Sequence, residues 1–455
     1  MAASTPEEWL PILAERLDRR YPRIAWLRSY VGTNPPMPEM GQNIRASWIA
    51  FQRKACTNYG GLAVESLANR MIPNGLRVGE TDDNPIVTAA RRIWRDNRMD
   101  VQIADTIRDV LTCSIGYMVI GSSDGEAVIS REIPEQSIAA ADPTRPWKAR
   151  AFLKVWRDVD AGNDYAYVYV PGQRQRFARK SVTDTNVTIT TASGGWEIDG
   201  QPEVYRGDPP VVILERHGGL GLFEPHIPVI DRINLGKLQR LVISAMQAFK
   251  QRALRVSKDG KGGLPQKDAQ DNDIDWAKVF EPAPGALWEL PEGIDVWESE
   301  QTDIRPLLEG EKTDARDFAA VTRTPISVFI PEGENQSAEG AAYAREGQVF
   351  QANDEIARIT TSLAVAIVYA LRAEGIEIGS DTLEVLWEPP HLASQVEKYA
   401  AAKDATGIVS RKTIQRDILG MSPDQIAQDE ADLAAEQLQA FTLTGSSGGD
   451  VPAAR

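Results

Sequence analysis

A regular helical pattern runs through residues 231–256, DRINLGKLQRLVISAMQAFKQRALRV. Apolar side chains recur there in steps of three and four, at Leu235, Leu238, Val242, Met246, Phe249 and Ala253. This spacing places the six side chains along one face of a helix. Counted from Pro228, the helix would have about 29 residues and measure about 43 Å. The pattern therefore predicts one long helix that ends at Val256.

The segment that follows, residues 257–303, is acidic and rich in turn-forming residues. It holds twelve acidic residues against four lysines, and short runs such as Val296-Trp297-Glu298 are strand candidates. A second helix is predicted over residues 304–322, because Thr302 or Asp303 can cap its start and Thr324-Pro325 stops it. An acidic, loop-rich excursion thus lies between two long helices.

The residues before the first long helix divide into a helical part and a β-rich part. Helices are predicted over residues 7–31, 45–72 and 84–112, and Pro22 predicts a kink or a split in the first of them. Residues 115–215 contain short β-branched and aromatic runs that Gly, Pro, Asp and Asn residues separate. Such runs are typical of an antiparallel meander.

The residues after the second long helix begin with a loop over 326–336. Ser337 can then cap a long helix, in which Gly347 is a candidate bend, and Leu383–Trp387 follows as a strand. The helix has an apolar stripe of Val349, Ala352, Ile356, Ile359, Leu363, Ile367 and Ala370. Residues 393–440 are alanine-rich and helical in pattern. The glycine- and serine-rich end of the chain is predicted to be disordered.

The overall composition excludes several functional classes. The chain has 455 residues and a formal charge of −15, which argues against wrapping nucleic acid but not against letting it pass through. Two cysteines, Cys56 and Cys113, and three scattered histidines predict neither a metal cluster nor a disulfide framework, so no metal or cofactor is expected. The run Ile359–Ala373 is too short and too polar to span a bilayer, and no signal peptide is apparent. A cytosolic protein without a membrane partner is expected.

Motifs of catalysis are weak or missing in this sequence. It contains no Walker A motif, and Gly218-Gly-Leu-Gly221 fits a connector better than a dinucleotide turn. The carboxylates of residues 268–303 fit a solvated face or a docking surface better than an acid–base pair. The aromatic residues Trp276, Phe280, Trp288 and Trp297 fit either an interface or a small local β-core.

Several segments resemble a known family in their order along the chain. They are Trp26–Tyr30 with Gly32, Asn69–Val78, Ile93–Met99, Ser114–Ile120, Asp231–Asn234, and the pair Thr322–Pro325 and Asn335–Glu339 that brackets a loop. Together they resemble the portal proteins of tailed double-stranded DNA bacteriophages, especially phages of actinobacteria, over roughly residues 7–440. Arg70 and Met71 depart from the acidic or small residues that are common at these positions.

The resemblance implies an α+β portal fold with named parts. Residues 1–227 would form the wing, helical over 1–112 and β-rich over 113–216. Residues 228–256 and 304–325 would be the two stem helices, with a small α/β clip over 257–303 between them. The remaining parts would be a tunnel loop (326–336), a long kinked helix with the return strand of the wing (337–390), a helical crown (391–441) and a disordered tail (442–455).

The resemblance also implies the function of a structural protein that is not an enzyme. The chain would assemble in the bacterial cytoplasm into a ring of about twelve copies at the capsid vertex of the virion. Double-stranded DNA would pass through the channel of this ring during genome packaging and ejection. The expected partners are the large terminase subunit, the head–tail adaptor at the connector, the major capsid protein and the scaffolding protein.

The candidate site residues follow from these assignments. The tunnel loop contributes Phe329, Pro331, Glu332, Gly333, Glu334, Asn335 and Gln336, and an acidic lining would leave the DNA without a deep binding minimum. Phe329 is a candidate for contact with DNA, and burial at a subunit contact is its alternative. Arg305, Arg316 and Arg323 are the candidate channel cations of the stem, and Asp271, Asp273, Trp276, Trp288 and Trp297 are the candidate docking residues of the clip.

Two other functional classes remain open from the sequence. One is a different virion subunit, such as a head–tail adaptor or a scaffold, although adaptors are usually shorter and scaffolds more uniformly helical. The other is a hydrolase that uses the carboxylates of residues 268–303, which would leave the long helices unexplained. The size of the assembly in solution separates these classes.

Overall fold

The computed structural model describes residues 3–32, 34–38, 46–78, 85–181, 194–248, 252–256, 267, 273, 294–298, 303–331, 338–378, 383–391 and 395–445. The chain divides into two compact units. Unit 1 comprises Met1–Thr33, Asn58–Ile227 and Ala319–Arg455, and unit 2 comprises Asn34–Thr57 and Pro228–Phe318.

Unit 1 begins with α1 (Pro6–Val31), which a capping box of Thr5 and Glu8 starts. The helix continues through Pro11 and Pro22, so the split predicted at Pro22 does not occur. Its buried side includes Leu13, Leu17, Ile24, Leu27 and Tyr30. We attribute the continuity to this burial, because each large apolar side chain contributes about 1.5–3 kcal/mol, comparable to the cost of an interior proline.

The second and third predicted helices are each divided in two. Residues 45–72 form α2 (Ala46–Ala55), which belongs to unit 2, and α3 (Tyr59–Ala68), which Asn58 caps by accepting from the Gly61 amide at 3.1 Å. Residues 84–112 form α4 (Pro85–Asp96) and α5 (Met99–Cys113). Arg98 between them has a φ of 51°, a left-handed conformation that ends the helical run.

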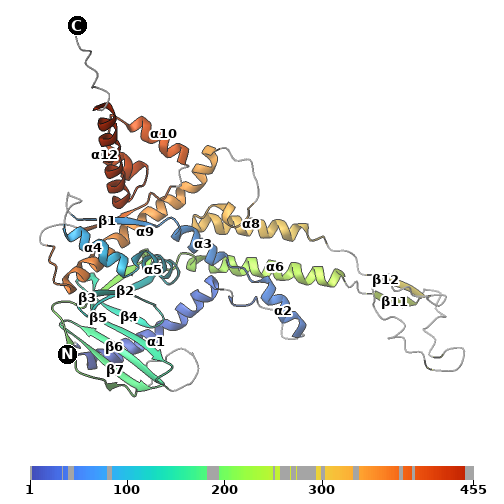
Figure 1. The fold of residues 1–455 in the computed structure, drawn as a ribbon. Helices are drawn as coiled ribbons and strands as arrows, with labels where there is room; N and C mark the ends of the chain where they lie inside the picture. Colours follow the sequence, from blue (N-terminus) through green and yellow to red (C-terminus); the bar gives the residue numbers. More distant parts are fainter. Residues whose placement is uncertain are drawn as a thin grey trace, which may run out of the picture. The chain divides into compact units, whose positions relative to one another are not determined.

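The predicted β-rich region forms one antiparallel sheet of nine strands, in the order β3-β2-β10-β5-β6-β7-β8, with β4 paired to β5 and β9 to β7. This confirms the antiparallel prediction, except that β10 inserts between β2 and β5. The strands are β2 (Ile115–Ser123), β3 (Glu126–Glu132), β4 (Ser137–Asp142), β5 (Arg145–Asp158), β6 (Asn163–Val170), β7 (Gln173–Lys180), β8 (Glu197–Ile198), β9 (Glu203–Val204) and β10 (Val211–Glu215). Figure 1 shows α1 beside the sheet. The buried residues Leu153 and Val168, which are cross-strand partners, share a cluster with Leu13 and Leu17 of α1.

The long helix α9 (Ala338–Ala373) packs against β2, β10 and β13. Of its predicted apolar stripe, Ala352, Ile359, Leu363, Ile367 and Ala370 are buried. The helix is uninterrupted at Gly347. The return strand β13 (Leu383–Trp387) forms where predicted and pairs antiparallel with β1 (Pro73–Val78).

The part of α9 from Arg345 to Ala373 is long and apolar enough to cross a membrane, judged by length and composition alone. The expectation from the sequence concerned only the shorter run Ile359–Ala373. In this fold, the apolar side chains Ile359, Leu363 and Ile367 are buried in the protein core. Packing against the sheet therefore accounts for part of the apolar character of the helix, because 33% of its most apolar stretch is buried.

A glycine-rich connector follows β10 and contains two short 3-10 helices, η1 (His217–Gly219) and η2 (Glu224–His226). A Cβ atom on Gly221 would lie 2.2 Å from the Thr112 carbonyl oxygen, so only glycine fits there. The Gly221 amide donates to Glu224 at 2.7 Å, and Glu224 also pairs with Arg23 of α1 at 2.5 Å. The predicted connector is thus a close-packed turn.

The end of the chain is helical, as predicted for residues 391–441. It contains α10 (Gln395–Ala405), α11 (Arg411–Thr413), η4 (Ile414–Ile418) and α12 (Pro423–Gly445). The last helix continues to Gly445, so residues 442–445, which were predicted to belong to a disordered tail, are helical. Residues 446–455 lie outside the described part of the chain.

Candidate channel and docking surfaces

Unit 2 contains most of two helices, α6 (Ile227–Ala248) and α8 (Arg305–Thr322), which ion pairs join along their length. Arg240 Nε lies 2.9 Å from Glu311 Oε1. Arg232 lies 2.8 Å from Asp314 and 3.2 Å from Asp317. The later residue of α6, Arg240, pairs with the earlier residue of α8, Glu311, and the earlier Arg232 pairs with the later Asp314. The two helices therefore run antiparallel (Figure 1).

The helix pair has a small buried seam of its own. Leu238 of α6 is buried, as are Ala315 and Phe318 of α8. A Cβ atom on Gly236 would lie 3.7 Å from the Glu311 side chain, which is an ordinary contact distance, so this side chain packs beside Gly236. Burial lowers the pKa of the Lys237 amine, and the nearby Glu311 carboxylate only partly offsets this effect.

The junction between α2 and α6 is fixed by one buried amide. Asn234 is 1% exposed, and its Oδ1 accepts from the Thr57 amide at 2.9 Å and from the Thr57 hydroxyl at 2.8 Å. Both residues belong to unit 2. This pair was not found from the sequence, because nothing in the pattern links positions 57 and 234.

The prediction that the first long helix extends to Val256 is wrong. The helix ends at Ala248, and Arg252–Val256 form the strand β11, which pairs antiparallel with β12 (Ile294–Glu298). In this register Arg252 stands opposite Glu298, and Arg255 stands opposite Asp295. The spacing of four residues between the apolar Phe249 and Ala253 fits a helix and a strand equally well, so it could not locate the end of the helix. The strand predicted at residues 296–298 is confirmed by β12.

The clip candidates are only partly within the described residues. Trp297 lies in β12 opposite Ala253, and Asp273 forms an isolated β-bridge with Lys267. Asp271, Trp276 and Trp288 lie outside the described residues. Docking by this segment therefore remains a prediction.

The candidate channel cations of α8 share one exposed side of the helix. Arg305 and Arg316 are both exposed, and their separation of eleven residues turns the helix by about 20° beyond three full turns. Arg305 pairs with Asp303 at 2.9 Å, and the Arg305 amide also donates to Asp303, which acts as the predicted cap. Arg323 is exposed after the helix ends, with a φ of 54°.

Phe329 is buried inside its own subunit, and its role in contact with DNA stays a prediction. Its side chain is 7% exposed, and its ring centroid lies 5.1 Å from that of Tyr59. It follows the short 3-10 helix η3 (Ile326–Val328). Pro331 is exposed, whereas Glu332, Gly333, Glu334, Asn335 and Gln336 lie outside the described residues.

The chain after the loop is anchored by a buried glutamine of α9. Gln348 is 1% exposed; its amide nitrogen donates to Ser66 at 2.8 Å, and its oxygen accepts from Arg70 Nε at 2.7 Å. Arg70 Nη1 also donates to the Pro390 carbonyl oxygen at 2.8 Å. Arg70, which departs from the family pattern, therefore connects α9 to the residues after β13. Phe329 before the loop and Gln348 after it are both fixed in unit 1.

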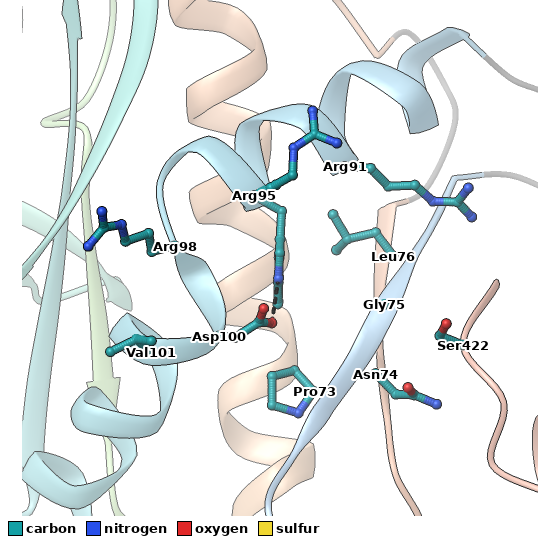
Figure 2. A pocket seen from close by; sticks show the side chains of 11 residues that line it. Pro73, Asn74, Gly75, Leu76, Arg91, Arg95, Arg98, Asp100, Val101 and Ser422 are labelled. Carbon is teal, nitrogen blue, oxygen red and sulfur yellow. Dashed lines mark hydrogen bonds between the residues drawn. The ribbon is translucent and has the colours of Figure 1, made fainter. Parts of the chain in front are cut away.

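Figure 2 shows a surface hollow of about 670 Å³ between β1, the corner of α4 and α5, and Ser422. Arg91, Arg95 and Arg98 surround it, and Asp100 is the acidic residue in its lining. Trp94 Nε1 donates to Asp100 Oδ1 at 2.7 Å. The lining offers no pair of carboxylates for acid–base catalysis. Among the described residues, no group of three or more His, Cys, Asp or Glu side chains could hold a metal ion.

Comparison with known proteins gives one match across nearly the whole chain. The family model described as "Phage portal protein, SPP1 Gp6-like" matches residues 12–440. No curated protein matches the chain.

The chain is also similar to several solved structures. A chain in the virion of a native gene transfer agent particle has 15% identity and a TM-score of 0.47, and the match covers 88% of this chain and 99% of that one. A chain in the neck of the native particle, computed with C12 symmetry, has 14% identity and a TM-score of 0.46, with 85% and 96% covered. An HK97-family phage portal protein from Corynebacterium diphtheriae has 13% identity and a TM-score of 0.35, with 76% and 93% covered. At these TM-scores the assignment rests on the family model.

Proposed function

The chain belongs to the SPP1 Gp6-like family of phage portal proteins, a structural component of the virion, and we propose that it forms a closed ring of about twelve copies around a DNA channel. The observation that carries this proposal is the family match over residues 12–440. The ring would occupy one vertex of the capsid, after assembly of the particle in the host cytoplasm.

A ring of identical chains needs head-to-tail contacts that close on themselves. The antiparallel pair of α6 and α8 offers exposed apolar side chains for such contacts, since Leu235 is 40% exposed and Leu308 is 37% exposed. The ion pairs of Arg232 and Arg240 hold the two helices together within one copy. These features support a two-helix stem as the repeated element of the ring.

In the proposed channel, acidic side chains repel the DNA phosphates and a few arginines attract them. Glu332 and Glu334 of the tunnel loop would repel DNA phosphates from all sides, while Arg305 and Arg316 offset the repulsion at their own levels of the ring. A moving duplex then meets no site that binds it tightly. The chain has no Walker A motif, so the energy for packaging would come from the large terminase subunit.

The remaining partners are proposed from the same assignment. The terminase would dock on the clip, residues 257–303, and the head–tail adaptor would take its place after packaging. The excess of acidic over basic residues in this segment suits partners with basic docking surfaces. The major capsid protein and the scaffolding protein would contact the ring within the assembling shell.

The channel proposal is tested by reversing the charge of the tunnel loop. We expect Glu332→Lys combined with Glu334→Lys to reduce packaged DNA per particle or to slow ejection, because twelve-fold repetition turns the loop into a ring of cations. A matched control is Glu7→Lys with Glu197→Lys, since both residues are exposed elsewhere in the wing. Normal DNA content and normal ejection by the loop variant would refute the acidic lining.

A further inference from the structure

The crown segment, residues 395–445, has almost no core of its own. Among its described side chains only Ile414, Gln415 and Ile426 are buried. Its large apolar side chains are mostly exposed: Val396 78%, Tyr399 64%, Ile408 82%, Val409 42% and Leu438 72%. A segment of this size that leaves so much apolar surface in water is typical of an interaction surface.

The two halves of the crown segment carry opposite charge. Residues 395–412 contain four basic and two acidic residues, whereas α12 contains five acidic residues and no lysine or arginine. Part of this charge is matched within one copy, because Arg411 pairs with Asp429 at 2.6 Å and Lys412 with Glu430 at 3.3 Å. Lys403, Asp432 and Glu436 are exposed and have no ion pair among the described residues.

A hollow of about 510 Å³ lies between α10, the turn after it and the start of α12. Its lining combines the apolar side chains Val409, Leu419 and Met421 with Lys403 and with the ion pair of Arg411 and Asp429, so Lys403 is the charged side chain of the lining without an ion pair among the described residues. Gln415 also lines it; this residue is 5% exposed, and its Oε1 has no hydrogen-bond partner among the described residues. A buried acceptor without a donor costs about 1–3 kcal/mol, so an incoming donor would be favoured here.

The exposed face of α12 is complementary to this hollow in its apolar surface and its charge. Ala431, Ala434, Ala435 and Leu438 recur at the spacing of one helical face, and all four are exposed. Asp432 lies beside this face, and Gln437 and Gln439 carry amide donors on either side of it. The face is apolar at its centre with Asp432 at its margin, whereas the hollow is apolar with Lys403 at its margin.

We propose that α12 of one copy docks onto α10 and the hollow of the next copy, so that the crown is completed only between neighbours. The inference rests on the proposed ring, because a basic hollow and an acidic helix on one chain form a head-to-tail contact that repeats around a ring. Asp432, beside the apolar face of one copy, then faces Lys403 of the next. Glu436 lies one turn further along α12 and Lys398 lies earlier on α10, so these two residues add to the same opposite charges at longer range. Leu438 enters the hollow near Val409.

The test is a charge exchange between the two surfaces. One variant combines Lys398→Glu with Lys403→Glu, a second combines Asp432→Lys with Glu436→Lys, and a third carries all four changes. We expect each two-residue variant to raise the subunit concentration at half assembly about tenfold, because like charges then oppose each other. The four-residue variant restores opposite charges and should return to within about threefold of the wild type.

Controls and outcomes separate this inference from the proposed ring. The control pair Lys180→Glu and Glu197→Lys changes exposed residues of the sheet and should assemble like the wild type. Circular dichroism checks that the variants keep their helices. If the wild type forms rings and both two-residue variants assemble equally well, the crown contact is wrong and the ring stands. If the wild type forms no ring, both proposals fail.

A second measurement reads the crown contact without substitutions. Hydrogen exchange of backbone amides in residues 395–445 should be at least about tenfold slower in the assembled ring than in the free subunit. Residues 115–180 of the sheet, which is built within one copy, serve as the internal reference. Equal exchange of the crown segment in both states would overturn the proposal.

Discussion

Asp164 is a fully buried carboxylate in the sheet of unit 1. Arg157 Nε and the Ser181 hydroxyl each donate to its Oδ1 at 2.7 Å, and Arg179 Nε lies 3.3 Å from its Oδ2. Burial raises the pKa of Asp164, but the hydrogen bonds from Arg157 and Ser181 and the charges of Arg157 and Arg179 outweigh burial, so the pKa is lowered. The ionised carboxylate therefore ties β5 and β6 to β7 and the residue after it.

We expect Asp164→Asn to lower the free energy of unfolding by about 3 kcal/mol at pH 7, because it leaves two arginines without their buried partner. The folded pKa lies below the unfolded value of about 3.9, so the contribution is present above that value and is lost as the pH falls through the folded pKa. The difference between wild type and variant should shrink below about pH 4. Denaturant unfolding between pH 3 and 7 measures it, with the exposed Asp160→Asn as control. An equal loss at both ends of this range would contradict the account.

Single residues are where sequence reasoning was weakest. The sequence left open whether Phe329 contacts DNA or is buried at a subunit contact, and the structure places its ring against Tyr59, 270 residues earlier in the same chain. Arg70 departs from the family pattern, but its contacts to Gln348 and Pro390 give it a structural role. Asn234 similarly meets Thr57. Such contacts depend on tertiary structure, and no local periodicity encodes them.

Helices and strands were predicted more reliably than their ends. The stripe of α9 and the strand β13 follow from apolar spacing alone, since their patterns are long or cleanly bounded. The end of α6 was missed because the partner strand of Arg252–Val256 lies about forty residues later in the chain. The breaks at Asn58 and Arg98 were missed because apolar spacing continues across them. The end of a helix or strand depends on which strand it pairs with and on which residue caps it. Both depend on contacts that form only in the folded protein.

The antiparallel pair of α6 and α8 leads to a prediction about its ion pairs. Arg240 and Glu311 are partly buried, so their interaction should exceed that of a fully exposed pair. In a double-mutant cycle with Arg240→Gln and Glu311→Gln, we expect a coupling energy of about 1 kcal/mol that weakens as salt is added. Denaturant unfolding of the four proteins measures the coupling, and the pair Arg358 and Asp354 on α9 is an exposed reference. Strictly additive effects would show that the pair does not join the helices.

At the scale of the whole molecule, the sequence predicts the fold class and the family better than the surfaces that contact other molecules. The α+β composition, the helix pair and the helical crown follow from the sequence pattern, and the family match over residues 12–440 agrees with the resemblance that carried the portal assignment. The tunnel loop from Glu332 to Gln336 and most of the clip lie outside the described residues. Their roles depend on neighbouring copies and on partners. A single chain cannot specify these surfaces.

The central claim, that this chain closes into a ring, is tested most directly by the mass and shape of the purified protein. Mass photometry with negative-stain imaging, carried out over a range of concentrations and repeated with the scaffolding and capsid proteins present, measures both. The account predicts a closed ring of about twelve copies with an axial hole. A compact monomer or dimer under every one of these conditions would contradict it.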